Sequence, residues 1–247
     1  MASNDGIRTA IVTGASRGIG AAIADRLAHD GFAVTINYSG AAAPAESLVR
    51  TIEQRGGRAL AVKADVSDAG AMRRLFEATE SAFGGVDVLV NNAGIMSVAP
   101  MADSDDAMFD RMMAVNVRGT FNGMREAARR IRDGGRIVNV SSSVVGRWLE
   151  SYAVYTATKA AVEAMTPILA KELRGRGITV NTVAPGATET DLFLTGKSQE
   201  MLDRAVALVP LGRLGKTEDM AGVVAFLVGP DGGWVNGQVL RANGGTN

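Results

Sequence analysis

The sequence predicts an α/β protein built on a doubly wound, mainly parallel sheet. Seven short apolar runs alternate with longer segments of helical periodicity along the 247 residues. This alternation indicates βαβ units with right-handed crossovers. Most of the runs are nearly continuous Val, Ile, Leu and Ala, which is typical of strands buried on both faces. Glycine occurs 30 times whereas aromatic residues make up 5%, a composition that suits many tight turns.

The predicted elements follow one another without a linker, a repeat or a charge block, so we expect one domain over residues 1–247. The predicted strands are residues 9–13, 33–37, 59–63, 86–90, 136–140, 179–183 and 238–241. The predicted helices are residues 19–30, 45–55, 69–83, 105–132, 152–174 and 218–228. Gly31, Gly56 and Gly84 follow the first three helices, where a helix C-terminus favours glycine.

Residues 188–215 interrupt this alternation between the sixth strand and the last helix. The segment mixes apolar residues with Gly196, Lys197 and Pro210, and an insertion of this length is usually functional or disordered. Open α/β sheets bind ligands at the carboxyl ends of their strands. We therefore interpret the segment as a lid over that edge of the sheet.

Composition excludes several classes of protein. The 26 basic and 26 acidic side chains cancel, so no overall cationic field favours nucleic acid or an anionic membrane. The absence of cysteine excludes disulfides and thiolate chemistry, and the single His29 disfavours a histidine triad or a multi-histidine metal site. Residues 1–6 lack the pattern of an export signal, and the apolar stretch 221–229 is too short to span a bilayer. We expect a cytoplasmic protein without a metal.

A glycine-rich turn follows the first predicted strand and opens the first helix. Its sequence is Thr13-Gly14-Ala15-Ser16-Arg17-Gly18-Ile19-Gly20. Glycines there let backbone N–H groups approach a phosphate, which a helix N-terminus favours. The spacing differs from the common dinucleotide fingerprint, and a glycine-rich turn without a ligand remains an alternative.

The end of the second predicted strand favours NADP(H) over NAD(H). An acid at this point would bind the adenosine ribose of NAD, but the residues are Asn37, Tyr38 and Ser39, and the next acid is Glu46. Arg17 in the glycine turn could pair with a 2′-phosphate. A solvated loop charge is the alternative interpretation of Arg17.

Tyr155 and Lys159 stand four residues apart in the fifth predicted helix and therefore share one face. A free tyrosine has a pKa of about 10. An ammonium about 5 Å away at an effective dielectric of about 20 contributes about 3 kcal/mol, or roughly 2 pKa units. The pair would thus bring a phenol toward the range of a general acid–base. A surface Tyr–Lys pair is the alternative.

Ser142 and Asn116 are two further polar residues whose positions suggest a function. Ser142, at the end of the fifth predicted strand, could donate to a substrate oxygen, although three consecutive serines also suit a turn. Asn116 lies inside a long helical pattern, which asparagine disfavours, and this indicates a local role.

Together these residues resemble the short-chain dehydrogenase/reductase superfamily over nearly the whole chain, and most closely bacterial members of the 3-oxoacyl-carrier-protein reductase type. The landmarks are Thr13-Gly14-x3-Gly18-x-Gly20, Asp65-Val66, Asn91-Asn92-Ala93-Gly94, Asn116, Ser142, Tyr155-x3-Lys159 and Pro185-Gly186. The resemblance implies a Rossmann-like sheet in the order 3-2-1-4-5-6-7 with helices on both faces. It also implies a cofactor half (about residues 7–95), a catalytic and substrate half (about 96–247) and a homotetramer.

The resemblance also implies the roles of individual residues. Tyr155 would be the general acid or base, assisted by Lys159, Ser142 and Asn116. The cofactor would be held by Gly14, Ser16, Arg17, Gly18, Ile19, Gly20, Asn37, Tyr38, Ser39, Asp65, Val66, Asn91, Ala93, Gly94, Tyr155, Lys159, Pro185, Gly186, Thr188 and Thr190. Hydride transfer to a carbonyl needs no metal.

Three points depart from the family pattern or leave it ambiguous. Ser143 stands one residue nearer to Tyr155 than Ser142 does, so either could be the catalytic serine. We prefer Ser142 because of its position after the fifth predicted strand. Asn243 stands where the family commonly has aspartate. A carrier protein would require a basic docking face near the mouth of the site, for which the candidates are Arg129, Arg130, Arg132, Arg174 and Arg176; ordinary solvated helix faces are the alternative.

The main functional hypothesis is an NADP(H)-dependent reductase of a small-molecule ketone, or dehydrogenase of the corresponding alcohol. The mainly apolar candidate pocket, with Met96, Val98, Val144 and Leu149, suits a ketone with hydrophobic substituents. A 3-oxoacyl-thioester reductase of fatty-acid synthesis is a second hypothesis. A non-catalytic NADP(H)-binding sensor or scaffold is a third, from a different class.

Overall fold

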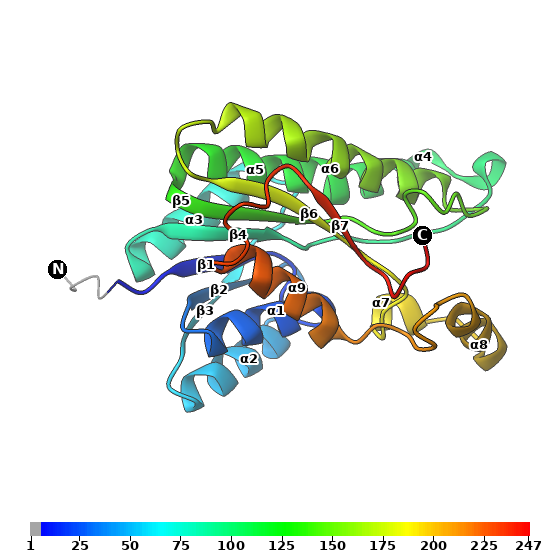
Figure 1. Ribbon diagram of the computed structural model, residues 1–247, viewed down its shortest axis with the longest axis horizontal. Coiled ribbons are helices and arrows are strands. Elements are labelled where there is room, and N and C mark those ends of the chain that lie inside the picture. The colour runs from blue at the N-terminus through cyan, green and yellow to red at the C-terminus, as the bar shows by residue number, and fades with distance from the viewer. Residues whose placement is uncertain (1–5) are drawn as a thin grey trace.

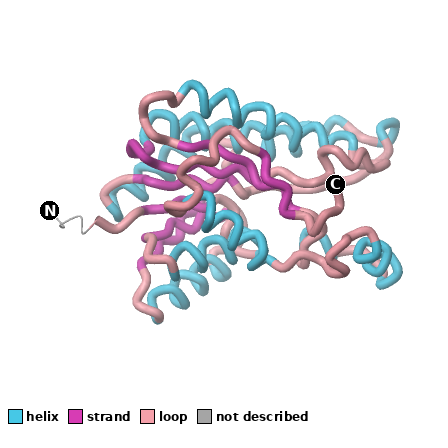
Figure 2. The backbone as a smooth tube through the Cα atoms, viewed as in Figure 1, coloured by secondary structure: helices cyan, strands magenta, loops and turns pink. Residues whose placement is uncertain are grey.

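A computed structural model describes residues 6–247 and contains one seven-stranded sheet between two layers of helices (Figure 1, Figure 2). The strand order is β3-β2-β1-β4-β5-β6-β7, and every neighbouring pair is parallel. The predicted doubly wound α/β fold and its strand order are confirmed. The prediction that the chain starts without an export signal concerns residues 1–5, which lie outside the described residues.

All seven predicted strands form; β5 begins five residues before its predicted start, and the other end points agree within two residues. The strands are β1 (Thr9–Val12), β2 (Ala33–Tyr38), β3 (Arg58–Lys63), β4 (Val86–Asn91), β5 (Ile131–Val140), β6 (Thr179–Pro185) and β7 (Val239–Ala242). The α-helices are α1 (Gly18–His29), α2 (Ala43–Gln54), α3 (Ala69–Phe83), α4 (Asp106–Met112), α5 (Gly119–Arg130), α6 (Ala153–Glu172), α7 (Asp191–Leu194), α8 (Gln199–Ala207) and α9 (Thr217–Val228).

Apolar residues fill both sides of the sheet because consecutive strand residues point to opposite faces. On one side, Val12 packs in a cluster with Leu27 of α1 and Leu227 of α9. On the other, Ile11 packs in a cluster with residues of α3, α5 and α6. Burial on both faces explains why the strand sequences are almost continuously apolar.

The helix predicted over residues 105–132 is wrong as one continuous element. It consists of α4, a π-helical segment η2 (Met113–Arg118) and α5, and residues 131–132 already belong to β5. A short 3-10 helix, η1 (Met101–Asp103), precedes α4. A π-turn adds one residue to the helical repeat and is frequent at functional sites, and this one contains Asn116.

The lid segment lies at the carboxyl ends of the strands and carries α7 and α8 (Figure 1). Its two ends are joined by a parallel bridge between Thr188 and Gly215. Glu189 N donates to Gly215 O, and Gly215 N donates to Ala187 O, both at 2.9 Å. The segment therefore leaves and rejoins the body of the protein at one point.

Among residues 6–247, no helix is both long and apolar enough to cross a membrane. Within the same range, no group of three or more His, Cys, Asp or Glu side chains is arranged to hold a metal ion.

Candidate active site

The ends of β5 and α6 bring Ser142 and Tyr155 together. Ser142 lies in the turn after β5, and Tyr155 lies in the first turn of α6. The Ser142 hydroxyl lies close enough to the Tyr155 hydroxyl to lower its pKa, and Tyr155 is almost fully buried. A hydroxyl pair of this kind can bind and protonate one substrate oxygen.

The two neighbouring serines are buried, and their hydrogen bonds go to groups other than Tyr155. The Ser141 hydroxyl donates to Glu163 Oε1 at 2.7 Å and to Lys159 O at 3.4 Å. Ser143 is buried, and its backbone N–H donates to Pro185 O at 2.8 Å. Ser142 is the member of the run that lies beside Tyr155.

Lys159 lies one helical turn after Tyr155 with only 5% of its surface exposed. Its Nζ donates to Val140 O at 2.9 Å and lies 5.8 Å from the centre of the Tyr155 ring. Removal from water disfavours an ammonium, and burial lowers the pKa of Lys159 to about 8. The side chain thus carries its charge at neutral pH and loses it in mildly alkaline solution.

The predicted depression of the Tyr155 pKa is wrong for this chain. Burial raises the pKa of Tyr155 to about 12, and the hydrogen bond with Ser142 opposes that rise. Desolvation of the phenolate outweighs the attraction of an ammonium at this distance. Tyr155 is therefore a fully protonated donor at neutral pH.

Asn116 is fixed by four hydrogen bonds from the π-helical segment. Its side-chain amide accepts from Ile95 N and donates to Ile95 O, both at 2.9 Å, and donates to Thr158 at 3.1 Å. Its backbone carbonyl accepts from Thr120 Oγ1 at 2.8 Å. Because Thr158 also donates to Tyr155 O at 2.7 Å, Asn116 links the loop after β4 to the first turn of α6.

The glycine turn makes close backbone approaches that a side chain would obstruct. At Gly14, with φ of +61°, a Cβ atom would lie 2.8 Å from Ala93 Cα. At Gly20 it would lie 2.4 Å from Asn92 Nδ2, and at Gly18 it would contact Thr190 at 3.6 Å. The turn therefore packs closely against the loop after β4 and contacts Thr190 at the start of the lid.

The start of α1 has the features of a phosphate site. Its first turn receives no hydrogen bond from a capping side chain, and its N-cap residue is Arg17. Arg17 is exposed and forms no ion pair with any residue in the range 6–247. Unpaired N–H groups at a helix start together with a free guanidinium suit a polyanion.

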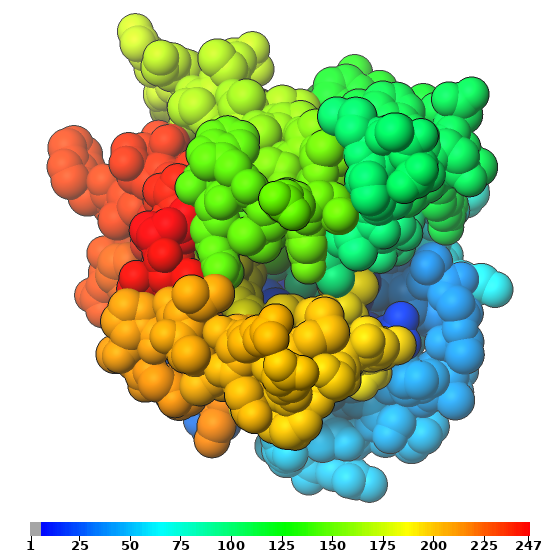
Figure 3. Space-filling model, turned by 90° about the vertical axis from the view of Figure 1, so that its right-hand side faces the viewer, coloured from blue at the N-terminus to red at the C-terminus, as the bar shows by residue number. Residues whose placement is uncertain are grey.

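A hollow separates the lid from the upper part of the molecule at the carboxyl ends of the strands (Figure 3). Blue atoms from the beginning of the chain are visible inside it, between the yellow and orange lid and the green segments. Two other cavities, of about 680 and 360 Å³, lie beside Phe32 at the amino end of β2 and do not include Tyr155.

Most of the predicted cofactor residues meet at this edge of the sheet. Ser39 is exposed after β2, and Asp65 follows β3. The Ser67 hydroxyl and backbone N–H hydrogen-bond to the Asp65 carboxylate and lower its pKa. A Cβ atom on Gly94 would lie 3.4 Å from both Asn116 Oδ1 and Lys159 Nζ. The remaining members lie at the ends of their strands or in the lid base, namely Tyr38, Val66, Pro185, Gly186 and Thr188.

The side chains of Asn37 and Asn91 are used inside the protein instead. Asn37 Oδ1 accepts from Gly14 N at 3.2 Å, and its Nδ2 donates to Ala64 O at 3.0 Å. Asn91 is buried and donates to Asn139 at 2.9 Å. Both amides therefore find their hydrogen-bond partners within the protein, as buried amides must.

Sequence reasoning assigned no role to Thr13 and Asn92, two residues that shape the turn. The Thr13 hydroxyl accepts from Asn92 N at 3.0 Å and from Ala93 N at 3.1 Å. Asn92 Nδ2 donates to Thr13 O at 2.9 Å and Gly14 O at 3.1 Å. Both residues directly follow a strand, and β1 and β4 are neighbours in the sheet. This placement could have indicated that the two side chains meet.

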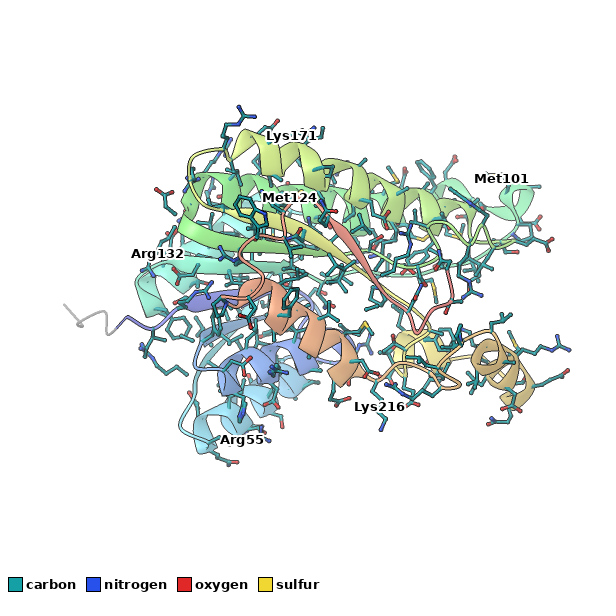
Figure 4. The ribbon with its side chains drawn as sticks, viewed as in Figure 1. Arg55, Met101, Met124, Arg132, Lys171 and Lys216 are labelled. Atoms are coloured by element: carbon teal, nitrogen blue, oxygen red, sulfur yellow. The ribbon has the colours of Figure 1, made fainter. Side chains whose placement is uncertain are left out.

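The arginines considered for a carrier-protein docking face lie at the opposite end of the sheet. Arg132 and Lys171 are labelled far from Lys216 and Met101, which lie at the lid end (Figure 4). Several of these arginines are paired within the protein: Arg130 with Glu80, Arg132 with Asp87, and Arg176 with Asp133. Their distance from the lid and their ion pairs favour ordinary helix faces over a docking face for a carrier protein.

Comparisons with known proteins agree with this geometry. A family model described as enoyl-(acyl carrier protein) reductase matches residues 14–247. A short-chain type dehydrogenase/reductase of Picea abies is 47% identical over 250 residues, covering 97% of this chain and 92% of that protein. A chloroplastic NADPH-dependent aldehyde reductase-like protein of Arabidopsis thaliana is 44% identical over 252 residues, covering 96% and 93%.

A solved structure resembles the chain equally closely. The short chain dehydrogenase from Burkholderia cenocepacia J2315, in complex with NADP, superposes with a TM-score of 0.92 at 42% identity. The match covers 97% of this chain and 98% of that one.

Burial of Lys159 gives stability a defined pH dependence. Between pH 8 and 10.5 the unfolded chain retains a proton that the folded chain has lost, so the contribution of Lys159 to stability rises with pH across this window. The rise amounts to roughly 3 kcal/mol across the interval between these two pKa values, at about 1.4 kcal/mol per pH unit. Urea unfolding of the wild type and Lys159→Met at several pH values should show it in the wild type alone.

Lys171→Met is the matched control, because Lys171 is an exposed lysine of the same helix. Its pH dependence should equal that of the wild type. An unchanged rise in Lys159→Met would show that the ammonium is not buried.

Proposed function

The chain belongs to the short-chain dehydrogenase/reductase family of oxidoreductases, and we propose that it transfers a hydride between NADP(H) and a ketone or its secondary alcohol. The observation that carries the proposal is the convergence of Ser142, Tyr155 and Lys159, with Asn116 fixed behind them. Bound nicotinamide supplies or accepts the hydride.

In this proposal each member of the catalytic set has a separate role. The Tyr155 hydroxyl donates its proton to the carbonyl oxygen during reduction and recovers one during oxidation. Ser142 donates a hydrogen bond to the same oxygen. The charged Lys159, whose pKa of about 8 leaves it protonated at neutral pH, stabilises the phenolate that remains. Asn116 holds the first turn of α6 in place and orients a water for proton return.

The residues around the glycine turn fit a dinucleotide. The start of α1 and the backbone of Gly14, Gly18 and Ile19 would hold the pyrophosphate. Asp65 and Val66 would frame the adenine, and Ala93 and Gly94 would support the middle of the cofactor. Lys159 would bind the nicotinamide ribose, while Thr188 and Thr190 of the lid base would contact the carboxamide.

Arg17 supports NADP(H) over NAD(H). It is exposed beside the glycine turn, and the end of β2 offers Tyr38 and Ser39 without a carboxylate to repel a phosphate. A guanidinium can bind a 2′-phosphate with charge-assisted hydrogen bonds. The relatives that are named as NADPH-dependent or solved with NADP are consistent with this choice.

An apolar ketone is the proposed substrate class. Tyr155 belongs to a cluster with Met112 and Val144, against which Met96 and Leu149 pack. Methionine side chains adapt to differently shaped apolar groups. The distant and internally paired arginines give no support to a carrier-protein thioester, and the complete catalytic set gives none to a purely binding role.

A homotetramer is the proposed assembly. Large apolar side chains are exposed on the long helices, including Phe109 on α4, Phe121 on α5 and Ile168 on α6. Trp234, before β7, is 99% exposed. Apolar surface of this kind commonly marks an interface between subunits.

Tyr155→Phe tests the chemistry, because it removes one hydroxyl and keeps the ring. The rate of NADPH oxidation with a responsive ketone should fall by about 100-fold or more, while NADPH still binds. Tyr152→Phe is the matched control, since its ring lies edge-on to Tyr155 at 6.4 Å, and it should retain activity. Full turnover in Tyr155→Phe would refute the mechanism, and cofactor binding without turnover in the wild type across a broad carbonyl panel would favour the sensor or scaffold.

Arg17→Ala tests the cofactor preference. Loss of a charge-assisted contact should lower kcat/KM for NADPH about 10-fold or more and leave that for NADH nearly unchanged. Arg26→Ala, which removes an exposed arginine of α1 paired with Asp30, should leave both values unchanged. An equal loss with the two cofactors would contradict the proposed role.

Light scattering tests the assembly. We expect a mass four times that of the 25.6 kDa chain, and Phe121→Asp should dissociate the complex if α5 lies in the interface. A wild-type mass of one chain would refute the tetramer.

A further inference from the structure

Residues 243–247 form a closed turn after β7. Asn243, which is buried, donates through Nδ2 to Asn247 Oδ1 at 2.7 Å and Asn247 O at 3.2 Å. Its Oδ1 accepts from Gly245 N at 3.0 Å, and its backbone carbonyl accepts from Thr246 Oγ1 at 2.7 Å. Asn243 thus uses both ends of its amide to fix the turn.

One side of this turn contacts the loop that carries Ser142. Asn247 Nδ2 donates to Ser143 O at 3.3 Å and to Val145 O at 3.4 Å. The approach requires glycine at position 146, where φ is +101° and a Cβ atom would lie 2.9 Å from Asn247 Nδ2. The backbone directly after Ser142 is therefore held by a segment far away in the sequence.

The other side of the turn contacts the end of the lid. Leu211 N donates to Gly244 O at 3.3 Å. A Cβ atom on Gly244 would lie 2.5 Å from Val209 Cγ1, and one on Gly245 would lie 3.1 Å from Pro210 Cγ. Figure 3 shows the red end of the chain beside a green segment and above the orange lid.

We propose that residues 243–247 act as a clamp that positions Ser142 and couples its loop to the lid. This inference rests on the proposed function for its catalytic consequence. A lid that moves when substrate binds displaces residues 209–211, and the clamp transmits the displacement to the backbone on the C-terminal side of Ser142. Asn243 and Asn247 are positioning residues, since they act through Ser142.

The amide of Asn243 gives the clamp both a donor and an acceptor. Its amide donates to Asn247 and accepts from Gly245, whereas an ionised aspartate can only accept. Asn243→Asp would retain the bond from Gly245 N. It would also place a carboxylate oxygen against Asn247 Oδ1, where two acceptors repel each other. The variant thus removes one side of the clamp with almost no change in shape.

The kinetic test uses Asn243→Asp and Asn247→Ala. We expect kcat/KM for the ketone to fall roughly fivefold, the cost of losing hydrogen bonds of this kind, while the dissociation constant for NADPH stays the same. Because Ser142 lowers the pKa of Tyr155, and Tyr155 must be deprotonated to act as the base, the pH at which alcohol oxidation rises should move upward. Gln238→Ala, which removes an exposed amide-to-carbonyl bond before β7, should change neither measurement.

Hydrogen exchange tests the clamp independently of turnover. Both variants should exchange faster at the amides of residues 143–147 and at Leu211, with no change in α3. Unchanged exchange at these amides, or unchanged ketone kinetics and pH profile in an active enzyme, would overturn the inference. If the wild type reduced no carbonyl while the variants still exchanged faster at both places, the proposed function would fail and the mechanical link would stand.

Discussion

A lysine ammonium held almost out of contact with water is the constraint on which the site depends. Lys159 is 5% exposed, and a buried charge requires hydrogen-bond partners close by. Val140 O at the end of β5 provides one, which fixes α6 against the strand that leads to Ser142. The absence of a side chain at Gly94 leaves room on the other side, where a Cβ atom would lie 3.4 Å from the ammonium. The same burial that lowers the pKa of Lys159 raises that of Tyr155, so one environment prepares a charged group and a protonated donor side by side.

The sequence was sufficient for the sheet and for the residues that meet at its carboxyl edge. Continuous apolar runs indicated strands, and glycine spacing indicated the turn before α1, since both are local properties of the chain. The break at η2 was not predictable from helical periodicity, which contains no information on the bonds of Asn116 to Ile95 and Thr158. Pairwise Coulomb reasoning gave the wrong direction for the Tyr155 pKa, because the depth of burial is a tertiary property. The buried hydrogen bond of Asn91 was not predictable for the same reason, since its partner Asn139 lies on the neighbouring strand.

The two ends of the sheet differ in how they use charge. At the amino ends, arginines such as Arg132 and Arg176 are paired with carboxylates and hydrogen-bonded to carbonyl oxygens, which ties loops together. At the carboxyl ends, Arg17 and Lys159 have no carboxylate partner among residues 6–247, and the start of α1 has no capping side chain. Parallel strands point all their carboxyl ends the same way, so the groups that we propose to bind ligands gather on one edge.

The Thr188–Gly215 bridge gives the lid the character of an exchangeable cassette. Because the segment departs and returns at paired backbone positions, its interior can be replaced without disturbing a strand of the sheet. Substrate preference could then diverge through that interior as well as through the apolar cluster around Tyr155. The contacts of residues 209–211 with Gly244 and Gly245 set the boundary of the unit, so a transplanted lid would have to bring residues 243–247 with it.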